Sequence, residues 1–395
     1  MRGFIETFLS YGFRPFFLLA GIYAVVPMLA WIAWYWMAAD GAVGAVTGPF
    51  PAHIWHGHEM LFGFTAAVVA GFFLTAAPNW TGKKPVHGPL LGALVVVWLA
   101  GRLAMWLSGV LSPIAIAALD LAFIPFLAIL VIHALSGGWS RRNAIFMPIL
   151  LALFLGNLMV HWDPAGEMAS RGLVLGLDAV VLLMTIIGGR VVPAFTTNAL
   201  RRRGEMEAPR SWPAIEAASI LLVAATLVVE AIWPYGPATA VVAAGAAVAN
   251  LVRLSGWRGS KVLNEPILWI LHLGYAWLIV GMAAKAMAAS GMWLAPTAAQ
   301  HALTVGAIGS LTLGVMSRAA LGHTGRRLEA APAVAVAYLL VTAAAIVRVG
   351  GALALPGHPV GVAATAGGLW TLAFLIFAAV YAPILVGPRQ RAEIT

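Results

Sequence analysis

The chain has 395 residues, of which 62% are hydrophobic and only 9% are charged, and it contains no cysteine. This composition excludes an ordinary water-soluble globular protein. The missing cysteines exclude disulfides, Cys-ligated iron–sulfur clusters, covalently attached c-type haem and thiolate metal sites, so any metal must be bound by His, Met, Tyr or a carboxylate.

Apolar runs of about 20 residues, the length that crosses a bilayer, recur along the whole chain. They predict an all-α fold: a polytopic membrane helical bundle of about 12 transmembrane helices that forms a single transmembrane domain, 1–395. A β-barrel is excluded because the runs are continuously apolar rather than alternating. The amphipathic N-terminus lacks a small-residue cleavage site, so we expect no removable signal peptide. The predicted spans are 16–39, 54–78, 89–110, 112–135, 143–161, 171–193, 212–233, 236–254, 265–288, 297–318, 330–353 and 362–386.

Basic residues concentrate in alternate connections between these spans. The positive-inside rule therefore predicts that both termini are cytoplasmic, in a bacterial inner (cytoplasmic) membrane. The net charge of +9 is then a topology signal, and we expect membrane lipid but no nucleic acid as a partner. The basic residues on the predicted cytoplasmic side include Arg14, Lys83, Lys84, Arg201, Arg202, Arg203, Arg326, Arg327, Arg389 and Arg391.

The second span opens with the sequence HIWHGHEM, which groups His53, His56, His58 and Glu59. Ionisable side chains are costly in a membrane and usually mark a metal, a proton route or an ion path. Neutral imidazole is also the commonest protein ligand for transition metals. On a helix, His56 and His58 project about 200° apart, which suits two different centres. The alternative is that the helix begins after His56 and both rings reach one ion.

Further polar residues lie in later spans. His301 is near the outer end of the tenth span, at a depth that the second-span histidines can share, whereas His272 is in the inner half of the ninth. His323 follows the tenth span in GHTGRR, roughly 33 Å of helix beyond His301, so these two cannot ligate one ion. Arg190, in a predicted helix end with two glycines, is a candidate anion-binding residue.

Other buried polar groups have structural interpretations. Arg102 and Asp120 lie near the midplane of consecutive spans and are predicted to pair across the hairpin, because an isolated charge there is expensive. His161 is interpreted as an interfacial residue beside a tryptophan, and Lys285 is expected to snorkel to the outer interface. Further buried polar positions are predicted at Asn157, Asp178 and Asn250.

Several segments together resemble the NnrS family of haem- and copper-containing polytopic membrane proteins, which are associated with nitric oxide metabolism. The resemblance covers the chain from near the N-terminus to about residue 327, in the order that the family has. The segments that carry it are FRPFFLLAG, WHGHEMLFGF, GFFLTAAPNWTG, the LWILHLGYAW sequence around His272, and QHALTVGAIG through MSRAALGHTGRR.

The resemblance implies non-covalent haem b together with copper or another transition metal such as iron. It also implies a part in denitrification or in defence against nitrosative stress. The histidines and the arginine above are the candidate ligands. For haem we expect His58, His272, His301, His323 and Arg190, and for the second metal His53, His56, His58 and His301.

The implied reaction is the reduction of nitric oxide to nitrous oxide, with electrons from an unidentified donor. Glu59 is the predicted proton donor or metal ligand, and Tyr275, one turn beyond His272, is predicted to donate a hydrogen bond to bound nitric oxide. The alternatives are a protein that binds or senses nitric oxide without turnover, a metal-maintenance protein, and a small-solute transporter. No internal duplication is evident in the sequence, which counts against the transporter.

Overall fold

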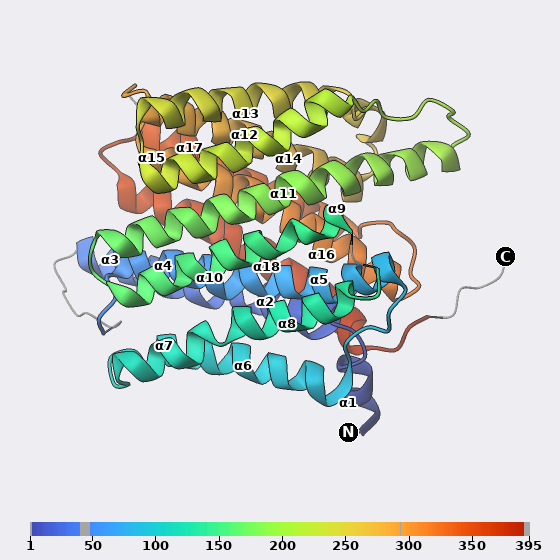
Figure 1. The fold of residues 1–395 in the computed structure, drawn as a ribbon, viewed down its shortest axis with the longest axis horizontal. Helices are drawn as coiled ribbons and strands as arrows, with labels where there is room; N and C mark the ends of the chain where they lie inside the picture. Colours follow the sequence, from blue (N-terminus) through green and yellow to red (C-terminus); the bar gives the residue numbers. More distant parts are fainter. Residues whose placement is uncertain (1, 40–47, 139, 293, 391–395) are drawn as a thin grey trace. The chain divides into compact units, whose positions relative to one another are not determined.

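The computed structural model describes residues 2–39, 48–138, 140–292 and 294–390, and all regular structure in them is helical (Figure 1). The predicted all-α class is therefore confirmed. Arg391 and residues 40–47 of the first predicted outer loop lie outside the described residues. The helices are α1 (Arg2–Phe8), α2 (Phe13–Tyr23), α3 (Val26–Ala39), α4 (Ala52–His58), η1 (Glu59–Thr65), α5 (Ala66–Thr81), α6 (Gly88–Trp106), α7 (Pro113–Leu121), α8 (Phe123–Leu135), α9 (Arg141–Ala144), α10 (Phe146–Trp162), α11 (Glu167–Arg202), α12 (Pro213–Ile232), α13 (Pro237–Ser255), η2 (Gly259–Val262), α14 (Pro266–Ala289), α15 (Pro296–His301), η3 (Ala302–Ile308), α16 (Gly309–His323), α17 (Pro332–Ala354) and α18 (Pro359–Val386).

Membrane-length helices account for nearly every predicted span. Within the described residues, 11 helices are long and apolar enough to cross a membrane. Several of them are composite, such as α4–η1–α5 over Ala52–Thr81 and α15–η3–α16 over Pro296–His323. The remaining predicted span, 143–161, corresponds to α10, an apolar helix of 17 residues. The polytopic helical bundle is thus confirmed.

The chain divides into two compact units. Unit 1 comprises Met1–Leu177, Ala319–Arg327 and Phe374–Thr395, and unit 2 comprises Asp178–Arg318 and Leu328–Ala373. Unit 1 therefore contains the beginning and the end of the chain, and unit 2 contains most of its second half. Helices α11, α16 and α18 each continue from one unit into the other.

Helix α11 is longer than the sequence analysis predicted. The predicted span ended at residue 193, but the helix runs for 36 residues from Glu167 to Arg202 with Pro193 inside it. Proline is tolerated in membrane helices because neighbouring groups satisfy the freed backbone carbonyl. Arg190 therefore lies within a helix, and the predicted helix end at this arginine is wrong. The adjacent Gly189 leaves the space that the Arg253 guanidinium occupies.

Two of the spans share an unusual local structure. Helix α4 ends at His58 and continues as the π-helical segment η1, and α15 ends at His301 and continues as the π-helical segment η3. Within η1, the hydroxyl of Thr65 donates to the carbonyl of Met60, five residues back, at 2.8 Å. π-helical turns inside α-helices are rare and frequently lie at functional sites.

The likeness continues along both spans with the same spacing. Each π segment has a glycine at its fifth position, Gly63 and Gly306. Near the far end, Thr81 and Thr324 donate to the carbonyl four residues back, at 3.1 Å and 2.6 Å. Each threonine precedes a glycine with positive φ, 73° and 75° respectively, and then two basic residues. These two spans are local repeats of one another, which the sequence analysis missed, although the likeness covers single spans rather than halves of the chain.

An N-terminal arginine connects the two ends of the chain within unit 1. Arg14 is only 4% exposed, and its Nη1 donates to the carbonyls of Leu385 and Gly387 at 2.8 Å and 2.6 Å. These two carbonyls lie at the C-terminal end of α18, where helix carbonyls have no intrahelical partner. A buried cation near such carbonyls is stabilised by the helix dipole as well as by the hydrogen bonds.

Candidate functional site

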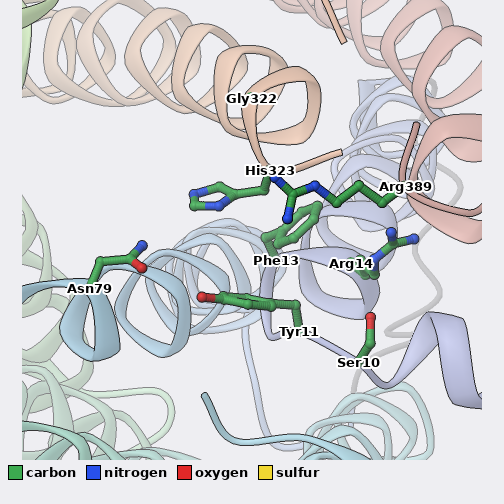
Figure 2. Close-up of a pocket in the computed structure, with 8 residues that line it drawn as sticks. All are labelled: Ser10, Tyr11, Phe13, Arg14, Asn79, Gly322, His323 and Arg389. Atoms are coloured by element: carbon green, nitrogen blue, oxygen red, sulfur yellow. The ribbon is translucent and has the colours of Figure 1, made fainter. Parts of the chain in front are cut away.

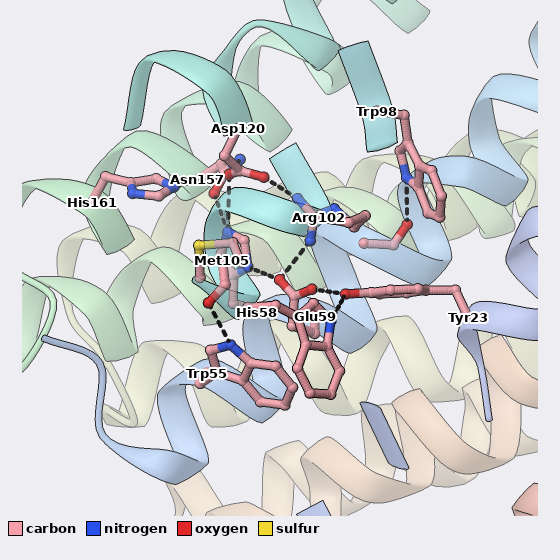
Figure 3. A network of polar contacts seen from close by, with 12 residues as sticks. Tyr23, Trp55, His58, Glu59, Trp98, Arg102, Met105, Asp120, Asn157 and His161 are labelled. Carbon is pink, nitrogen blue, oxygen red and sulfur yellow. Dashed lines mark hydrogen bonds and ion pairs between the residues drawn. The ribbon is translucent and has the colours of Figure 1, made fainter. Parts of the chain in front are cut away.

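A buried polar cluster in unit 1 surrounds the junction of α4 and η1 (Figure 3). His58 ends α4 and Glu59 begins η1, and neither side chain is exposed to solvent. The cluster, called the His58 cluster below, consists of His58, Glu59, Tyr23 from α2, Arg102 from α6, Asp120 from α7, and Asn157 and His161 from α10.

Both ring nitrogens of His58 face oxygen atoms. Nδ1 lies 2.7 Å from Glu59 Oε1, and Nε2 lies 2.8 Å from Asn157 Oδ1 and 3.1 Å from Asp120 Oδ2. A carboxylate on one imidazole nitrogen fixes the orientation of the ring, and the other nitrogen can then donate a proton or, once deprotonated, bind a cation.

Asp120 is the centre of the His58 cluster. Its Oδ2 accepts from Asn157 Nδ2 at 2.7 Å and lies 2.9 Å from Nε2 of His161. Its Oδ1 forms an ion pair with Arg102, so the predicted pairing across the hairpin is confirmed. The carboxylate is only 1% exposed, and these contacts satisfy both of its oxygens.

Arg102 lies between two carboxylates. Besides Asp120, it donates from Nη1 to Glu59 Oε1 at 2.5 Å. The other oxygen of Glu59 accepts from the Tyr23 hydroxyl, which itself accepts from Trp106 Nε1 at 2.9 Å. Two carboxylates around one guanidinium leave one negative charge, which a protonated His58 or a bound cation balances.

Three side chains of the cluster have the geometry of a metal site. One ligand atom each from His58, Asp120 and His161 lie within 4.8 Å of one another, in the part of the chain that the structure describes. Imidazole nitrogen with carboxylate oxygen is a donor set that suits divalent transition metals. The structure thus shows a potential metal site at the junction of α4 and η1.

Only part of this site is predicted from the sequence. The HIWHGHEM motif marks His58 and Glu59, but the interfacial interpretation of His161 is wrong, because its side chain is 3% exposed and touches buried Asp120. The spacing of Asn157 and His161 was an available signal. Residues four apart on a helix share a face, and Asn157 was already predicted to be buried.

The other histidines of HIWHGHEM point elsewhere. Helix α4 includes both His56 and His58, so the alternative in which the helix begins after His56 is wrong. The His56 ring stacks on Trp31 with centroids 4.6 Å apart, on another side of the helix from the His58 contacts. His53 is exposed. His56 and His58 thus face different surroundings, and their assignment to two different centres stays a prediction.

In unit 2, His272 and Tyr275 belong to a second set of polar contacts. Nε2 of His272 lies 2.9 Å from the Thr196 hydroxyl, and a methyl group on Gly259 would come within 2.8 Å of Nδ1. The Tyr275 hydroxyl donates to Asn250 Oδ1 at 2.5 Å and accepts from Arg253 at 2.9 Å. Only Nε2 of His272 thus has a hydrogen-bond contact, whereas Nδ1 is buried beside Gly259 without a partner among the described residues.

His301 has one ring nitrogen in a hydrogen bond and one that can bind a metal. Its Nδ1 donates to the carbonyl of Thr297 at 2.6 Å, which leaves Nε2 as the nitrogen that can bind a metal. Helix α14 packs antiparallel to η3 and α16, because Gly281 lies beside Leu303 and Gly274 lies beside Leu311. This alignment gives the positions of His272 and His301 along the two neighbouring helices. His272 and His301 are then about 17 Å apart along the helices, too far to share one ion.

His323 lines a polar cavity of about 310 Å³ in unit 1 (Figure 2). Its ring packs against Tyr11 and Phe13, with centroids 5.7 Å and 5.4 Å apart. Burial raises the pKa of the Tyr11 phenol, while the charge of Arg389 acts in the opposite direction. The full lining is Ser10, Tyr11, Phe13, Arg14, Asn79, Gly322, His323 and Arg389, without a carboxylate among them.

This cavity and the His58 cluster lie at opposite ends of one span. Asn79, which lines the cavity, is 21 residues after His58, or roughly 32 Å along the helix. No single group can therefore contact both His58 and His323. Three of the segments that carry the family resemblance meet at the cavity, through Arg14, Asn79 and His323.

Membrane-length helices around a buried His and carboxylate cluster define a polytopic membrane protein with a potential transition-metal site. Residues 7–389 match the NnrS protein family, which is nearly the whole chain, so the protein belongs to the NnrS family. Membership agrees with the resemblance found in the sequence and associates the protein with nitric oxide metabolism. A search of curated proteins found no match.

Proposed function

We propose that this NnrS family member binds nitric oxide at a transition metal held by His58, Asp120 and His161 and reduces it to nitrous oxide. The observation that supports the proposal is the convergence of two imidazoles and a carboxylate within 4.8 Å in a membrane protein of this family. Reduction joins two nitric oxide molecules and consumes two electrons and two protons, giving nitrous oxide and water. An unidentified donor supplies the electrons.

Copper is the proposed metal for the His58 cluster. The donor set is consistent with it, and Glu59 on Nδ1 of His58 is the kind of outer contact that orients a metal-bound imidazole. A redox-active metal here supplies a binding site for nitric oxide and a path for electrons. His53 and His56 are not included in this ligand set, because the first is exposed and the second stacks on Trp31.

Haem b fits some of the candidate residues better than others. His301 leaves Nε2 available, and His323 lies in a cavity with cationic residues that suit haem carboxylates. His272 fits less well because the Thr196 hydroxyl contacts its Nε2 and the backbone of Gly259 lies beside its Nδ1. We therefore propose His301 and His323 as haem contacts.

The protein's own side chains supply positions and protons in this proposal. Asp120 and Asn157 hold the His58 ring, and Arg102 neutralises one of the two carboxylate charges. Glu59, in contact with Tyr23 and His58, is the proposed proton donor. Tyr275 is not included, because its hydroxyl proton is already donated to Asn250.

The test uses purified protein and three alanine variants. Metal content is measured by mass spectrometry, haem by its Soret absorbance, and nitrous oxide by gas chromatography after adding nitric oxide and an artificial reductant. We expect His58→Ala and His161→Ala to lose the metal and the nitrous oxide, and His53→Ala, on the same helix as His58 but exposed, to keep both. Full metal content in His58→Ala and His161→Ala would refute the site. Bound nitric oxide without nitrous oxide would refute the reductase activity.

A further inference from the structure

A second group of buried ionisable residues lies in unit 2. Asp178 comes from α11, Glu230 from the last turn of α12, and Lys285 from the last turns of α14. Their exposed fractions are 3%, 2% and 3%. Lys285 Nζ lies 2.7 Å from Asp178 Oδ1, so the expectation that Lys285 snorkels to the interface is wrong.

The carboxylate oxygens of this group are only partly satisfied. Both oxygens of Glu230 and Oδ2 of Asp178 are buried without a hydrogen-bond partner among the residues that the structure describes. Leaving such oxygens unpaired in a membrane segment is expensive, so groups of this kind usually have a role in binding or moving ions or protons. Glu230 nevertheless lies close enough to the Lys285–Asp178 ion pair to interact electrostatically with both of its members.

The charges do not balance without an additional ligand. Asp178 and Glu230 carry two negative charges when ionised, and Lys285 carries one positive charge. One bound proton makes the group neutral. The protonated carboxyl then has an O–H that can donate a hydrogen bond to an unsatisfied carboxylate oxygen of the group. A neutral group costs far less to bury than one with an uncompensated charge.

Polar side chains connect the group to the loop between α12 and α13. Tyr235 lies in that loop, with a positive φ of 55°, and accepts from Gln300 Nε2 at 3.1 Å. Burial raises the pKa of the Tyr235 phenol, and the charge of Glu230 raises it further, so the two groups lie close enough to interact electrostatically. Thr239, at the start of α13, is the other hydroxyl beside Glu230.

We propose that Asp178, Glu230 and Lys285 form a buried proton-binding site that exchanges protons with the aqueous phase at the α12–α13 loop, past Tyr235. Glu230 binds the proton, and Lys285 with Asp178 sets the charge around it. The proposal requires neither a metal nor turnover of nitric oxide, so it can be tested independently of the proposed function.

The test is infrared difference spectroscopy of the purified full-length protein between acidic and alkaline pH, in water and in deuterium oxide. We expect a protonated-carboxyl band that changes with pH, shifts on deuteration, and is lost in Glu230→Gln. Glu216→Gln is the matched control, since Glu216 is on the same helix but its side chain is 26% exposed and paired with Arg253. A band that persists in Glu230→Gln, or disappears equally in Glu216→Gln, would overturn the proposal.

Lys285→Met provides a second, independent measurement. Without the ammonium group, two carboxyls remain with no cation, so the protonated-carboxyl band should grow at the same pH. Lys285→Met also tests the proposal if size-exclusion chromatography shows that Glu230→Gln is not folded. An unchanged band in Lys285→Met, or a wild-type signal that follows sodium concentration rather than pH, would show that the group does not bind a proton in this way.

Discussion

Asp120 contacts four side chains from three other helices: Arg102, His58, Asn157 and His161. Each contact uses the carboxylate as acceptor, and none of the partners is exposed enough for water to replace it. At the residue scale, the charge of Asp120 is thus the feature on which the His58 cluster depends most.

We expect Asp120→Asn to destabilise the folded protein by about 3–5 kcal/mol, because Arg102 loses one of its two buried counter-charges. The measurement is the thermal unfolding midpoint of the purified protein in detergent. Asp163→Asn is the control, because Asp163 ends α10 outside the cluster. Equal midpoints for the two variants would show that the pair contributes little to stability.

Asn157 touches two of the proposed metal ligands without being one. Its Nδ2 donates to Asp120 and its Oδ1 faces His58 Nε2. Removing such a supporting contact typically lowers metal affinity by about 10–100-fold. We expect that loss in Asn157→Leu, measured by metal titration, and none in Asn79→Leu at the far end of the same unit. An unchanged affinity in Asn157→Leu would argue against metal binding at Asp120 and His58.

Sequence motifs and helix depth predict part of the His58 cluster. The HIWHGHEM motif marked His58 and Glu59, and depth counting paired Arg102 with Asp120. The sequence does not show which helices pack side by side, so it predicts an interfacial position for His161 and a snorkelling side chain for Lys285. Both side chains instead meet a buried carboxylate on another helix, and this depends on tertiary packing.

At the scale of elements, the two π segments stand out. A π turn accommodates one more residue than an α turn, and so it changes the direction in which the following residues point by about 100°. His58 and His301 each precede such a segment immediately. Hydrophobic periodicity predicts that a helix exists at these positions, but it does not reveal a local change from α to π, so neither segment was predicted.

Deleting Thr65, the last residue of η1, should convert the segment to α-helix and rotate His58 and Glu59 by about 100° relative to α5. We expect this variant to insert into the membrane but to lose the metal of the His58 cluster, as measured by metal content. Deleting Ile308, the corresponding residue of η3, is the control and should leave that metal bound. Loss of metal in both deletions, or in neither, would contradict the role given to η1.

At the scale of the whole molecule, composition and length predicted the helical class and nearly all spans, because a bilayer imposes both requirements on the sequence. The positive-inside pattern also predicts that the α12–α13 loop faces outward and the C-terminus inward. The division into two units was not predicted, because the segments of unit 1 are far apart in the sequence.

The topology is tested by reporter fusions. Green fluorescent protein after Thr395 should fluoresce, because it folds in the cytoplasm, and alkaline phosphatase inserted in the loop at residues 233–236 should be active, because it requires the outer side. The positive charge of the opposite connections is the physical reason. Inactive phosphatase in the loop together with a non-fluorescent C-terminal fusion would show the reverse orientation.

The hydrogen bonds from Arg14 to the carbonyls of Leu385 and Gly387 have a consequence for biosynthesis. The first helices to leave the ribosome belong to a unit whose closing segment is translated last. Early in synthesis the guanidinium of Arg14 is therefore in the membrane without these two carbonyl partners. A chain that stops after Ala373 lacks the last segment of unit 1, so we expect unit 1 to be degraded by quality-control proteases. Unit 2 has all its residues in this truncated chain.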